Sequence, residues 1–450
     1  MAEPCTGAAA AAQPPTAPAE TPDLPSSSDR RPIGQRPSNA REGAPLPRLG
    51  LIPSRILNSL SPRSARVEQQ AEVRPSPNPP GAANQPSPDA AQQVPAAQPA
   101  PPPSPPGTSL VGWVTGPDSP NDTIGRFTIT GTDLGIMWDN GDPGGHQVLM
   151  AFGDTYGFCG VRGQQWRYNT LFRTQDGALA KTISVPNGAV GNQYSGSPQW
   201  APGLSKQIIN STKWAPNETG IIPTAGIAAG GNQYLNFMSI KSWDANGAWT
   251  TNYSAIAVSP DNGEHWGVYP GSVRTPRPDS IPGVQHVPGN ENFQQGAFMK
   301  AGPGDPYIYS FGTPSGRSGS AFVARVSPNS IPDPRRYEYW NSDSNSWVPG
   351  NPGAATPVIP GPVSEMSTQF NTYLKQYLVL YTNGANDVVA RTAPAPQGPW
   401  GPEQMLVPSM QFPGGVYGPS LHPWSTGREL YYNLSLWSAY NVMLMKTVLP

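Results

Sequence analysis

Two aspartates, Asp133 and Asp154, have the residue type and spacing needed for acid–base chemistry. They lie at nearly equal distances from a turn centred near residue 143, between two apolar runs. In an antiparallel hairpin such residues are cross-strand neighbours, with Cβ atoms roughly 5 Å apart if directly opposed. Two adjacent carboxyl groups at a cavity mouth suit glycoside hydrolysis: one protonates the leaving oxygen, and the other activates water or attacks the sugar. The alternative is that Asp133 caps a turn and Asp154 bonds to loop backbone.

Six further residues are expected at the same mouth, because each lies just before, or at the start of, a strand expected near the molecular axis. They are Asn217, Glu218, Glu291, Asn292, Glu365 and Tyr417. Amide and carboxylate groups can bind sugar hydroxyls, and Trp138 and Tyr156 can stack on sugar faces. Glu365 is also a rival to Asp154 for the role of the acid. Taken alone, each of these residues is more typical of a hydrogen-bonded turn residue.

A repeated triplet of strands must position these residues. Residues 108–450 contain short runs of Val, Ile, Tyr, Phe and Thr between Gly, Pro, Asn and Asp turns, and no helical period lasts beyond about two turns. The first strands are expected at 130–138, 224–229, 296–301, 367–373 and 418–424. The second strands are expected at 148–156, 233–240, 307–313, 377–383 and 429–437, and the third at 168–174, 254–259, 321–327, 387–393 and 441–448. Five such units predict an all-β, five-bladed β-propeller, a closed ring without exposed sheet edges.

One local motif supports this architecture. Residues 259–266 read SPDNGEHW and fit the S-x-D-x-G-x-x-W pattern of the Asp box, a turn between outer strands of sialidase-like propeller blades. Asp261 can bond turn amides, Gly263 can adopt positive φ, and Trp266 can pack under the hairpin. The role of this motif is therefore expected to be structural. Residues 391–400 end in Gly-Pro-Trp at the equivalent place and resemble blade ends of furanoside-cleaving propellers.

Residues 1–107 are expected to form a disordered tail rich in proline and alanine, followed by a propeller domain at 108–450. No aromatic residue precedes Trp113, so the tail cannot bury enough apolar surface to offset its ordering entropy. The chain has 28 basic and 29 acidic residues and a net charge of −1, which gives no reason to expect a nucleic-acid partner or an anionic membrane surface. No apolar run is long enough to predict a membrane span, and no secretory signal is evident.

No cofactor or metal is expected. Two cysteines, Cys5 and Cys159, exclude a disulfide scaffold and a thiolate zinc site and are interpreted as unpaired thiols. The four histidines, His146, His265, His286 and His422, lack metal-ligand spacing. His422 can either reach the axis or pack as a hydrogen-bonded core residue.

The stretch IGRFTITGTDLG at 124–135, followed by FGDTY at 152–156, resembles the start of a domain long labelled as of unknown function. That domain is abundant in mycobacteria and is associated with endo-D-arabinofuranases (endo-D-arabinanases), which cut the α-linked D-arabinan of arabinogalactan and lipoarabinomannan. The resemblance covers roughly residues 108–450. It implies a five-bladed propeller in the cell envelope or secreted, with Asp133 as base, Asp154 as acid and an inverting outcome. Inversion needs carboxyl groups about 6.5–9.5 Å apart, so it requires an offset register; a directly opposed pair favours retention.

Two other functions remain open from the sequence. A non-catalytic propeller could bind envelope glycan, because fold alone does not determine function. An intracellular scaffold could use the proline-rich tail as a ligand for partner proteins, and the absence of an evident signal peptide favours it. An open pocket beside Asp133 and Asp154 would favour catalysis, whereas burial of the pair in a turn would favour binding.

Overall fold

The computed structural model describes residues 107–157 and 166–450. The predicted tail lies outside the described residues except for Gly107, and so do Cys5 and Cys159. Among the described residues, no helix is long and apolar enough to cross a membrane.

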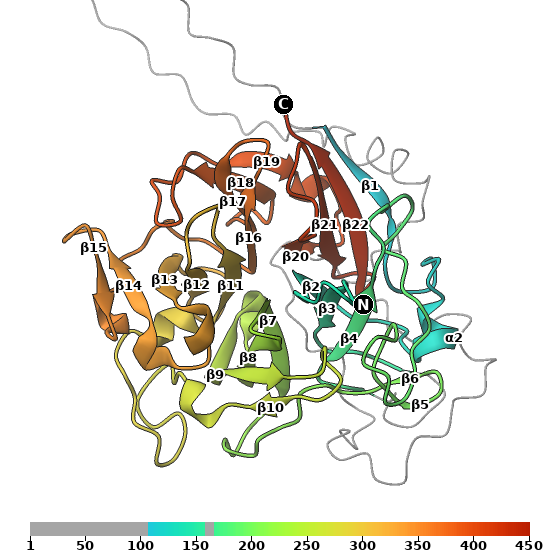
Figure 1. The fold of residues 1–450 in the computed structure, drawn as a ribbon, viewed down its shortest axis with the longest axis horizontal. Coiled ribbons are helices and arrows are strands. Elements are labelled where there is room, and N and C mark those ends of the chain that lie inside the picture. Colours follow the sequence, from blue (N-terminus) through green and yellow to red (C-terminus); the bar gives the residue numbers. More distant parts are fainter. Residues whose placement is uncertain (1–106, 158–165) are drawn as a thin grey trace, which may run out of the picture.

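Five β-sheets surround a common centre (Figure 1). The innermost strand of each sheet contacts the innermost strands of both neighbouring sheets, so the ring closes. These inner strands are β2 (Leu134–Asp139), β7 (Gly220–Ala229), β11 (Gln295–Lys300), β16 (Met366–Asn371) and β20 (Val416–Leu421). The predicted five-bladed, all-β propeller is confirmed.

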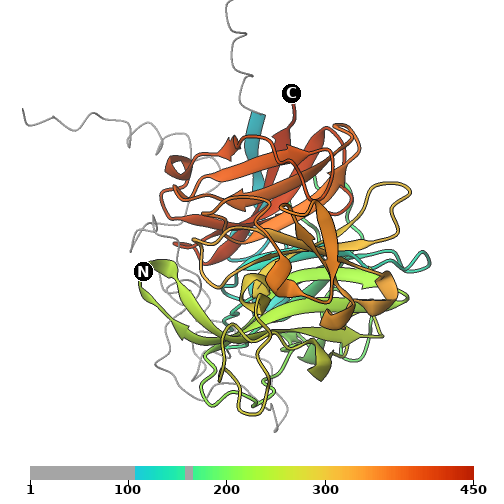
Figure 2. The same cartoon turned by 90° about the vertical axis from the view of Figure 1, so that its left-hand side faces the viewer.

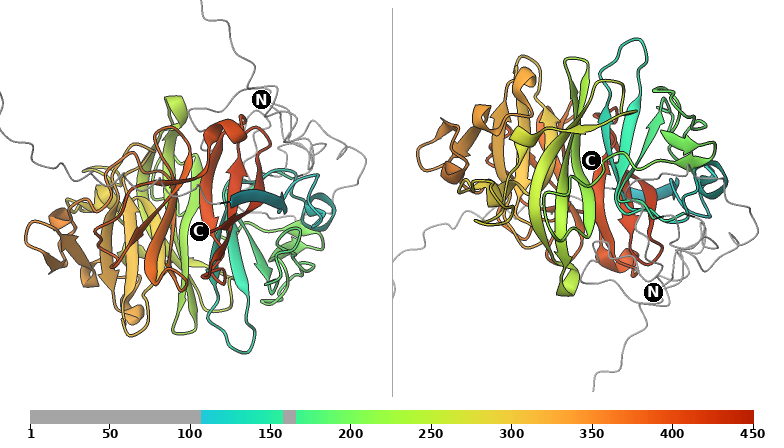
Figure 3. Two further views of the ribbon diagram at one scale, coloured as in Figure 1. Left: turned by 90° about the horizontal axis from the view of Figure 1, so that it is seen from above. Right: turned by 90° about the horizontal axis from the view of Figure 1, so that it is seen from below.

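Each blade continues outward through antiparallel pairing of successive strands, which Figure 3 shows from the side. The first blade adds β3 (Val148–Phe152) and β4 (Thr170–Thr174), and the second adds β8 (Asn232–Trp243), β9 (Trp249–Ser259) and β10 (Gly267–Val268). The third adds β12 (Ile308–Thr313), β13 (Phe322–Val326), β14 (Glu338–Asn341) and β15 (Ser346–Pro349), and the fourth adds β17 (Gln376–Thr382), β18 (Val388–Ala393) and β19 (Gln404–Val407). The fifth adds β21 (Glu429–Leu436) and β22 (Asn441–Val448).

The connections hold the remaining short elements. These are the helix α2 (Thr123–Phe127), the hairpin of β5 (Gln199–Ala201) and β6 (Leu204–Ser205), and the 3-10 turns η3 (Ala245–Gly247), η4 (Pro270–Ser272), η5 (Asn290–Phe293), η6 (Pro328–Ser330), η7 (Pro334–Arg336), η8 (Pro352–Ala354) and η9 (Ser409–Gln411).

The two ends of the described chain close the ring together. β1 (Gly107–Trp113) pairs antiparallel with β22, as the outermost strand of the fifth blade. Figure 2 shows β1 beside the C-terminal strands, and the hydroxyls of Thr108 and Thr447 lie 2.7 Å apart across the pair. Three strands were predicted for this blade from the sequence, and β1 was not among them, because the partner of β1 is more than 300 residues away.

Alternating side chains of the middle strands bind each blade to both of its neighbours. In β3 all five residues are buried. Val148, Met150 and Phe152 pack in a cluster with residues of β22, whereas Leu149 and Ala151 pack on the opposite side with residues of β7 and β8. A strand covered on both faces needs an unbroken apolar run, which is the pattern seen in the sequence.

The Asp box forms the expected turn between the outer strands β9 and β10. Asp261 Oδ1 accepts hydrogen bonds from the Ser259 hydroxyl at 2.8 Å and from the His265 amide at 2.9 Å. Gly263 has φ of 79°, and the Trp266 indole donates to its carbonyl at 3.1 Å. Trp266 packs edge-on against Trp138, with ring centroids 6.4 Å apart, so the motif joins the second blade to β2.

Candidate active site

Asp133 immediately precedes β2, and Asp154 follows β3, at the end of the propeller where the inner strands begin. The strands pair regularly from Asp139 to Ile136, but the register shifts before Leu134. Leu134 and Gly135 both have positive φ, 69° and 68°, and form this bulge. Gly153 therefore lies across from Asp133, and its amide donates to the Asp133 carbonyl at 3.1 Å. The aspartates are offset by one residue, which is one of the registers that the sequence left open.

The Asp133 carboxylate is held by a tyrosine from the fifth blade. The Tyr417 hydroxyl donates to Asp133 Oδ2 at 2.9 Å, and Tyr417 is fully buried. Asp133 Oδ1 lies against the backbone of Gly153, where an added Cβ would be only 2.4 Å from that oxygen. Glycine is therefore required at 153 for the carboxylate to occupy this position. Asp133 is 2 % exposed.

Aromatic side chains enclose the pair. Asp154 is 1 % exposed, and its charge acts on the hydroxyls of Tyr156 and Tyr440, whose rings meet edge-on at 5.6 Å. Trp437 packs against Tyr440 at 5.7 Å. Among the described residues no donor meets hydrogen-bond geometry at either Asp154 oxygen, although the Trp166 indole is close enough to favour the ionised form. The site is thus dry and of low dielectric, where charges interact strongly.

Burial raises the pKa of both carboxyl groups. For Asp133 the pKa rises from 3.8 to about 7, since burial and the charge of Glu365 outweigh the Tyr417 hydrogen bond and the charge of Arg317. For Asp154, burial and then the negative charge of Asp133 raise the pKa well above its usual value. We place the higher pKa on Asp154, because Asp133 alone has a tyrosine donor and a nearby cation. Near neutral pH the pair can therefore hold a proton on Asp154 and accept one on Asp133.

An ion pair borders this cluster. The Arg317 guanidinium contacts Glu365 through Nη2–Oε1 at 2.8 Å and Nε–Oε2 at 3.3 Å, and both side chains are 12 % exposed. Arg317 also lies over the Tyr417 ring, 5.5 Å from its centroid, and over the Trp249 ring at 5.2 Å. Glu365 thus holds the cation that favours ionised Asp133. This engagement weakens Glu365 as a rival acid, because both of its carboxylate oxygens already contact the Arg317 guanidinium.

The structure brings together four of the predicted site residues: Asp133, Asp154, Tyr156 and Tyr417, with Glu365 beside them. Trp138 instead lines a central cavity, where its indole donates to Gln233 at 2.9 Å and its ring covers Gly226.

The other four predicted residues point elsewhere. Glu218 accepts from the Ser239 hydroxyl of β8 at 2.6 Å and acts on Tyr253 of β9, so it faces the outer strands of the second blade. Asn217 is exposed, and its carbonyl accepts from Asn252. Glu291 and Asn292 belong to η5, where Glu291 accepts from the Gly289 amide at 2.8 Å. Glu291 and Asn292 thus lie in a turn, whereas Glu218 and Asn217 contact residues of β8 and β9.

The central cavity has a volume of about 480 Å³ and is lined by all five inner strands. Glu365 lines it, but Asp133 and Asp154 do not. Among the described residues no group of three or more His, Asp or Glu side chains could hold a metal ion. His422 is fully buried after β20, and burial lowers its pKa to about 4, so it is a neutral core residue.

Four residues of this cluster were not predicted from the sequence: Arg317, Tyr440, Trp166 and Trp437. Tyr440 and Trp437 lie between β21 and β22, and Arg317 lies in the β12–β13 connection, so none is near Asp133 in sequence. One signal could have pointed to three of them. In a propeller the connections between the second and third strands of all blades lie at the same end, so the β12–β13 and β21–β22 connections lie at the same end as the β3–β4 connection that holds Asp154.

Comparisons with known proteins extend over most of the propeller. Notoamide biosynthesis cluster protein J′ of Aspergillus versicolor is 26% identical over 335 residues, covering 70% of this chain and 83% of that protein. The catalytic domain of a GH62 α-L-arabinofuranosidase from Coprinopsis cinerea matches with a TM-score of 0.41 and 12% identity, over 76% of this chain and 94% of that one. A glycosyl hydrolase from Bacteroides ovatus matches with a TM-score of 0.42 and 10% identity, over 76% and 94%. The model of the domain of unknown function DUF4185 matches residues 118–446, and the chain therefore belongs to the DUF4185 family.

Proposed function

We propose that this protein is a glycoside hydrolase that cleaves internal α-D-arabinofuranosyl linkages of mycobacterial cell-wall D-arabinan, in arabinogalactan and lipoarabinomannan. The observation that carries the proposal is the coupled pair of buried carboxyl groups, Asp133 and Asp154, both with raised pKa. Carboxyl groups whose pKa values are strongly raised by burial and by each other's charge are characteristic of acid–base sites. The choice of D-arabinan, and of the cell envelope or the exterior as location, rests on the resemblance of residues 124–135 and 152–156.

The chemistry follows from the protonation states of the pair. Asp154, as carboxylic acid, donates its proton to the glycosidic oxygen as the bond from that oxygen to the anomeric carbon breaks. Asp133, as carboxylate, takes a proton from the water that attacks the anomeric carbon from the opposite side. The products are two shorter glycans, and the two carboxyl groups have exchanged protonation states, which solvent restores. The inverting course follows from the resemblance; it requires an offset register, and the two aspartates are offset by one residue.

The test is release of reducing ends from purified arabinogalactan by the full chain. Asp133→Asn and Asp154→Asn should each lower the rate at least about a hundredfold, as expected for loss of a general base or acid. Asp343→Asn, an exposed aspartate between β14 and β15, is the matched control and should keep full activity. Glu365→Gln tests whether Glu365, and not Asp154, is the acid. If Glu365→Gln abolishes activity while Asp154→Asn does not, Glu365 is the acid. Full activity in both aspartate variants refutes the site.

A second candidate function is a non-catalytic propeller that binds envelope glycan. It is favoured by the burial of Asp133 and Asp154, at 2 % and 1 % exposure, and by their absence from the lining of the central cavity. Calorimetric titration with D-arabinan oligosaccharides separates the two. Binding without any release of reducing ends by the unaltered protein supports the binding function and excludes the hydrolase.

A further inference from the structure

The central cavity is separate from the aspartate pair. It extends between the inner strands from Leu134 to Asp139, about 16 Å at 3.3 Å per residue, whereas Asp133 lies outside its lining. A volume of about 480 Å³ falls in the range of sites that enclose small organic molecules. The cavity thus offers a second place where the protein could bind a ligand.

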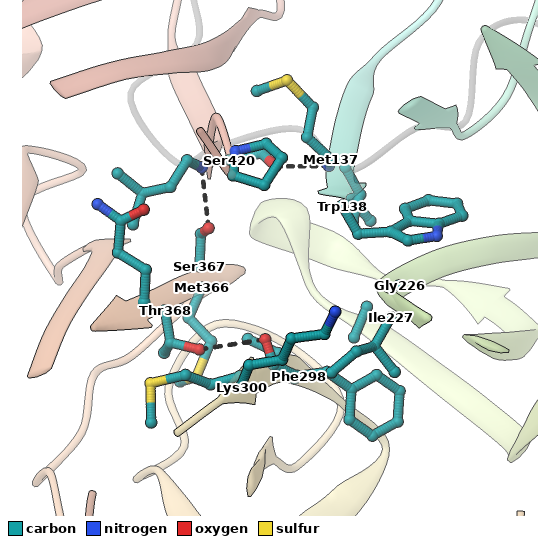
Figure 4. Close-up of a pocket in the computed structure, with 18 of the residues that line it drawn as sticks. Met137, Trp138, Gly226, Ile227, Phe298, Lys300, Met366, Ser367, Thr368 and Ser420 are labelled. Atoms are coloured by element: carbon teal, nitrogen blue, oxygen red, sulfur yellow. Dashed lines mark hydrogen bonds between the residues drawn. The ribbon is translucent and has the colours of Figure 1, made fainter. Parts of the chain in front are cut away.

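The wall of the cavity presents mainly apolar side chains (Figure 4). They include Ile136, Met137, Trp138, Ile227, Phe298 and Met366. Three hydroxyl groups of the wall are engaged between neighbouring blades. Ser420 accepts from the Met137 amide at 3.0 Å, Ser367 accepts from the Leu421 amide at 2.8 Å, and Thr368 donates to the Phe298 carbonyl at 3.4 Å. A molecule that fills this space therefore needs an apolar body.

A positive charge, that of Lys300, lies at the end of the cavity away from Asp133 and favours a ligand with a negative group. Lys300 ends β11, its side chain is exposed, and Figure 4 shows it reaching over the cavity. No ion pair among the described residues involves it, and the two acids that line the cavity are already engaged. Glu365 pairs with Arg317, and Asp139 accepts from His146 and from the Trp424 indole. The ammonium group of Lys300 can therefore bind an anionic group of a ligand.

We propose that the cavity binds an amphiphilic organic anion, with its apolar body between the inner strands and its carboxylate or sulfonate on Lys300. The proposal does not depend on hydrolysis, because no residue of the aspartate pair lines the cavity. It goes beyond the proposed function by assigning a small-molecule site to the central cavity, with the anion at the end away from Asp133.

Two fluorescent probes with the same aromatic body test this site on the full chain: 1-anilinonaphthalene-8-sulfonate, an anion, and N-phenyl-1-naphthylamine, which is neutral. The unaltered protein should bind both in the micromolar range, and the anion more tightly. Lys300→Gln should weaken the anionic probe about five- to tenfold and the neutral probe less than about twofold, because one partly screened charge pair is lost. Lys241→Gln, an exposed lysine on β8, is the matched control and should change neither.

Filling the cavity tests the location. Ile136→Trp, or Thr224→Trp from a different inner strand, places a large ring in the open space, since both residues are only partly buried. Either variant, if its circular dichroism and melting temperature match those of the unaltered chain, should lose both probes. Retention of both probes by the folded variants, equal weakening of both by Lys300→Gln, or no binding by the unaltered protein would overturn the proposal. Since no glycan is used, failure here leaves the hydrolase unaffected.

Discussion

Tyr417→Phe isolates the tertiary contact on which the base depends. The hydroxyl that it removes donates to Asp133 Oδ2 at 2.9 Å in a fully buried site. A buried hydrogen bond to a charged group contributes about 1.5–3 kcal/mol. Its loss should raise the pKa of Asp133 by about one to two units, since one unit corresponds to about 1.4 kcal/mol. The starting value is about 7.

The expected readout is the pH profile of arabinan cleavage. If ionised Asp133 is the base, activity falls as pH drops through its pKa, so the midpoint of the acid limb should move from about 7 to about 8–9. At pH 6.5 the ionised fraction, and with it the rate, should fall about eight- to seventy-five-fold, whereas the loss should be small well above pH 9. A purely structural defect would lower the rate equally at every pH.

Tyr432→Phe is the matched control. Tyr432 is equally buried, but its hydroxyl contacts Thr447 at 3.1 Å. Its acid limb should coincide with that of the unaltered protein. If the profile of Tyr417→Phe also coincides with it, Tyr417 does not set the protonation of Asp133.

Three further predictions concern stability as well as activity. Because the folded-state pKa of Asp133 is raised from 3.8 to about 7, the free energy of unfolding should fall by up to about 4 kcal/mol as pH rises between these values. Asp133→Asn cannot ionise and should not lose this stability. The variant should therefore melt several degrees higher than the unaltered chain at pH 8 but not at pH 4. Gly153→Ala places a Cβ 2.4 Å from Asp133 Oδ1 and should cost about 1–3 kcal/mol in urea unfolding together with most activity; an unchanged midpoint would contradict the close contact. Glu264→Gln breaks the buried ion pair with Arg173, at 2.9 Å with Arg173 fully buried, and should cost about 3 kcal/mol, whereas a loss below about 1 kcal/mol would show that backbone carbonyls suffice for Arg173.

The central cavity and the aspartate pair occupy different parts of the same ring, and each has its own test. Loss of arabinan cleavage in Asp133→Asn with normal probe binding, and loss of probe binding in Ile136→Trp with normal cleavage, would establish two independent sites. Coupled losses in both variants would indicate that the cavity and the carboxyl pair respond to one another through Leu134, which lines the cavity and adjoins Asp133.

Local patterns in the chain were sufficient to predict the strands. Alternating apolar side chains and Gly, Pro, Asn and Asp turns placed all fifteen expected strands, because pleat period and turn chemistry act over a few residues. Five repeats of the same triplet then determined a five-bladed ring. The Asp box was predicted with its contacts for the same reason: Asp261, Gly263 and Trp266 interact within eight residues.

Contacts between blades could not be read from the chain, because they join residues hundreds of positions apart. Tyr417 reaches Asp133 across 284 residues, and β1 closes the ring on β22 across a longer separation. The bulge at Leu134 and Gly135 offset the two aspartates by one residue. Counting residues on either side of the turn assumes a regular register and does not reveal such a bulge. Glu218 turned toward Ser239 and away from the axis, since the outer strands offered it a donor. The hairpin pattern alone predicted that Asp133 and Asp154 lie near each other at one end of β2 and β3. Their burial, the Tyr417 hydrogen bond and their raised pKa values come from packing between distant blades.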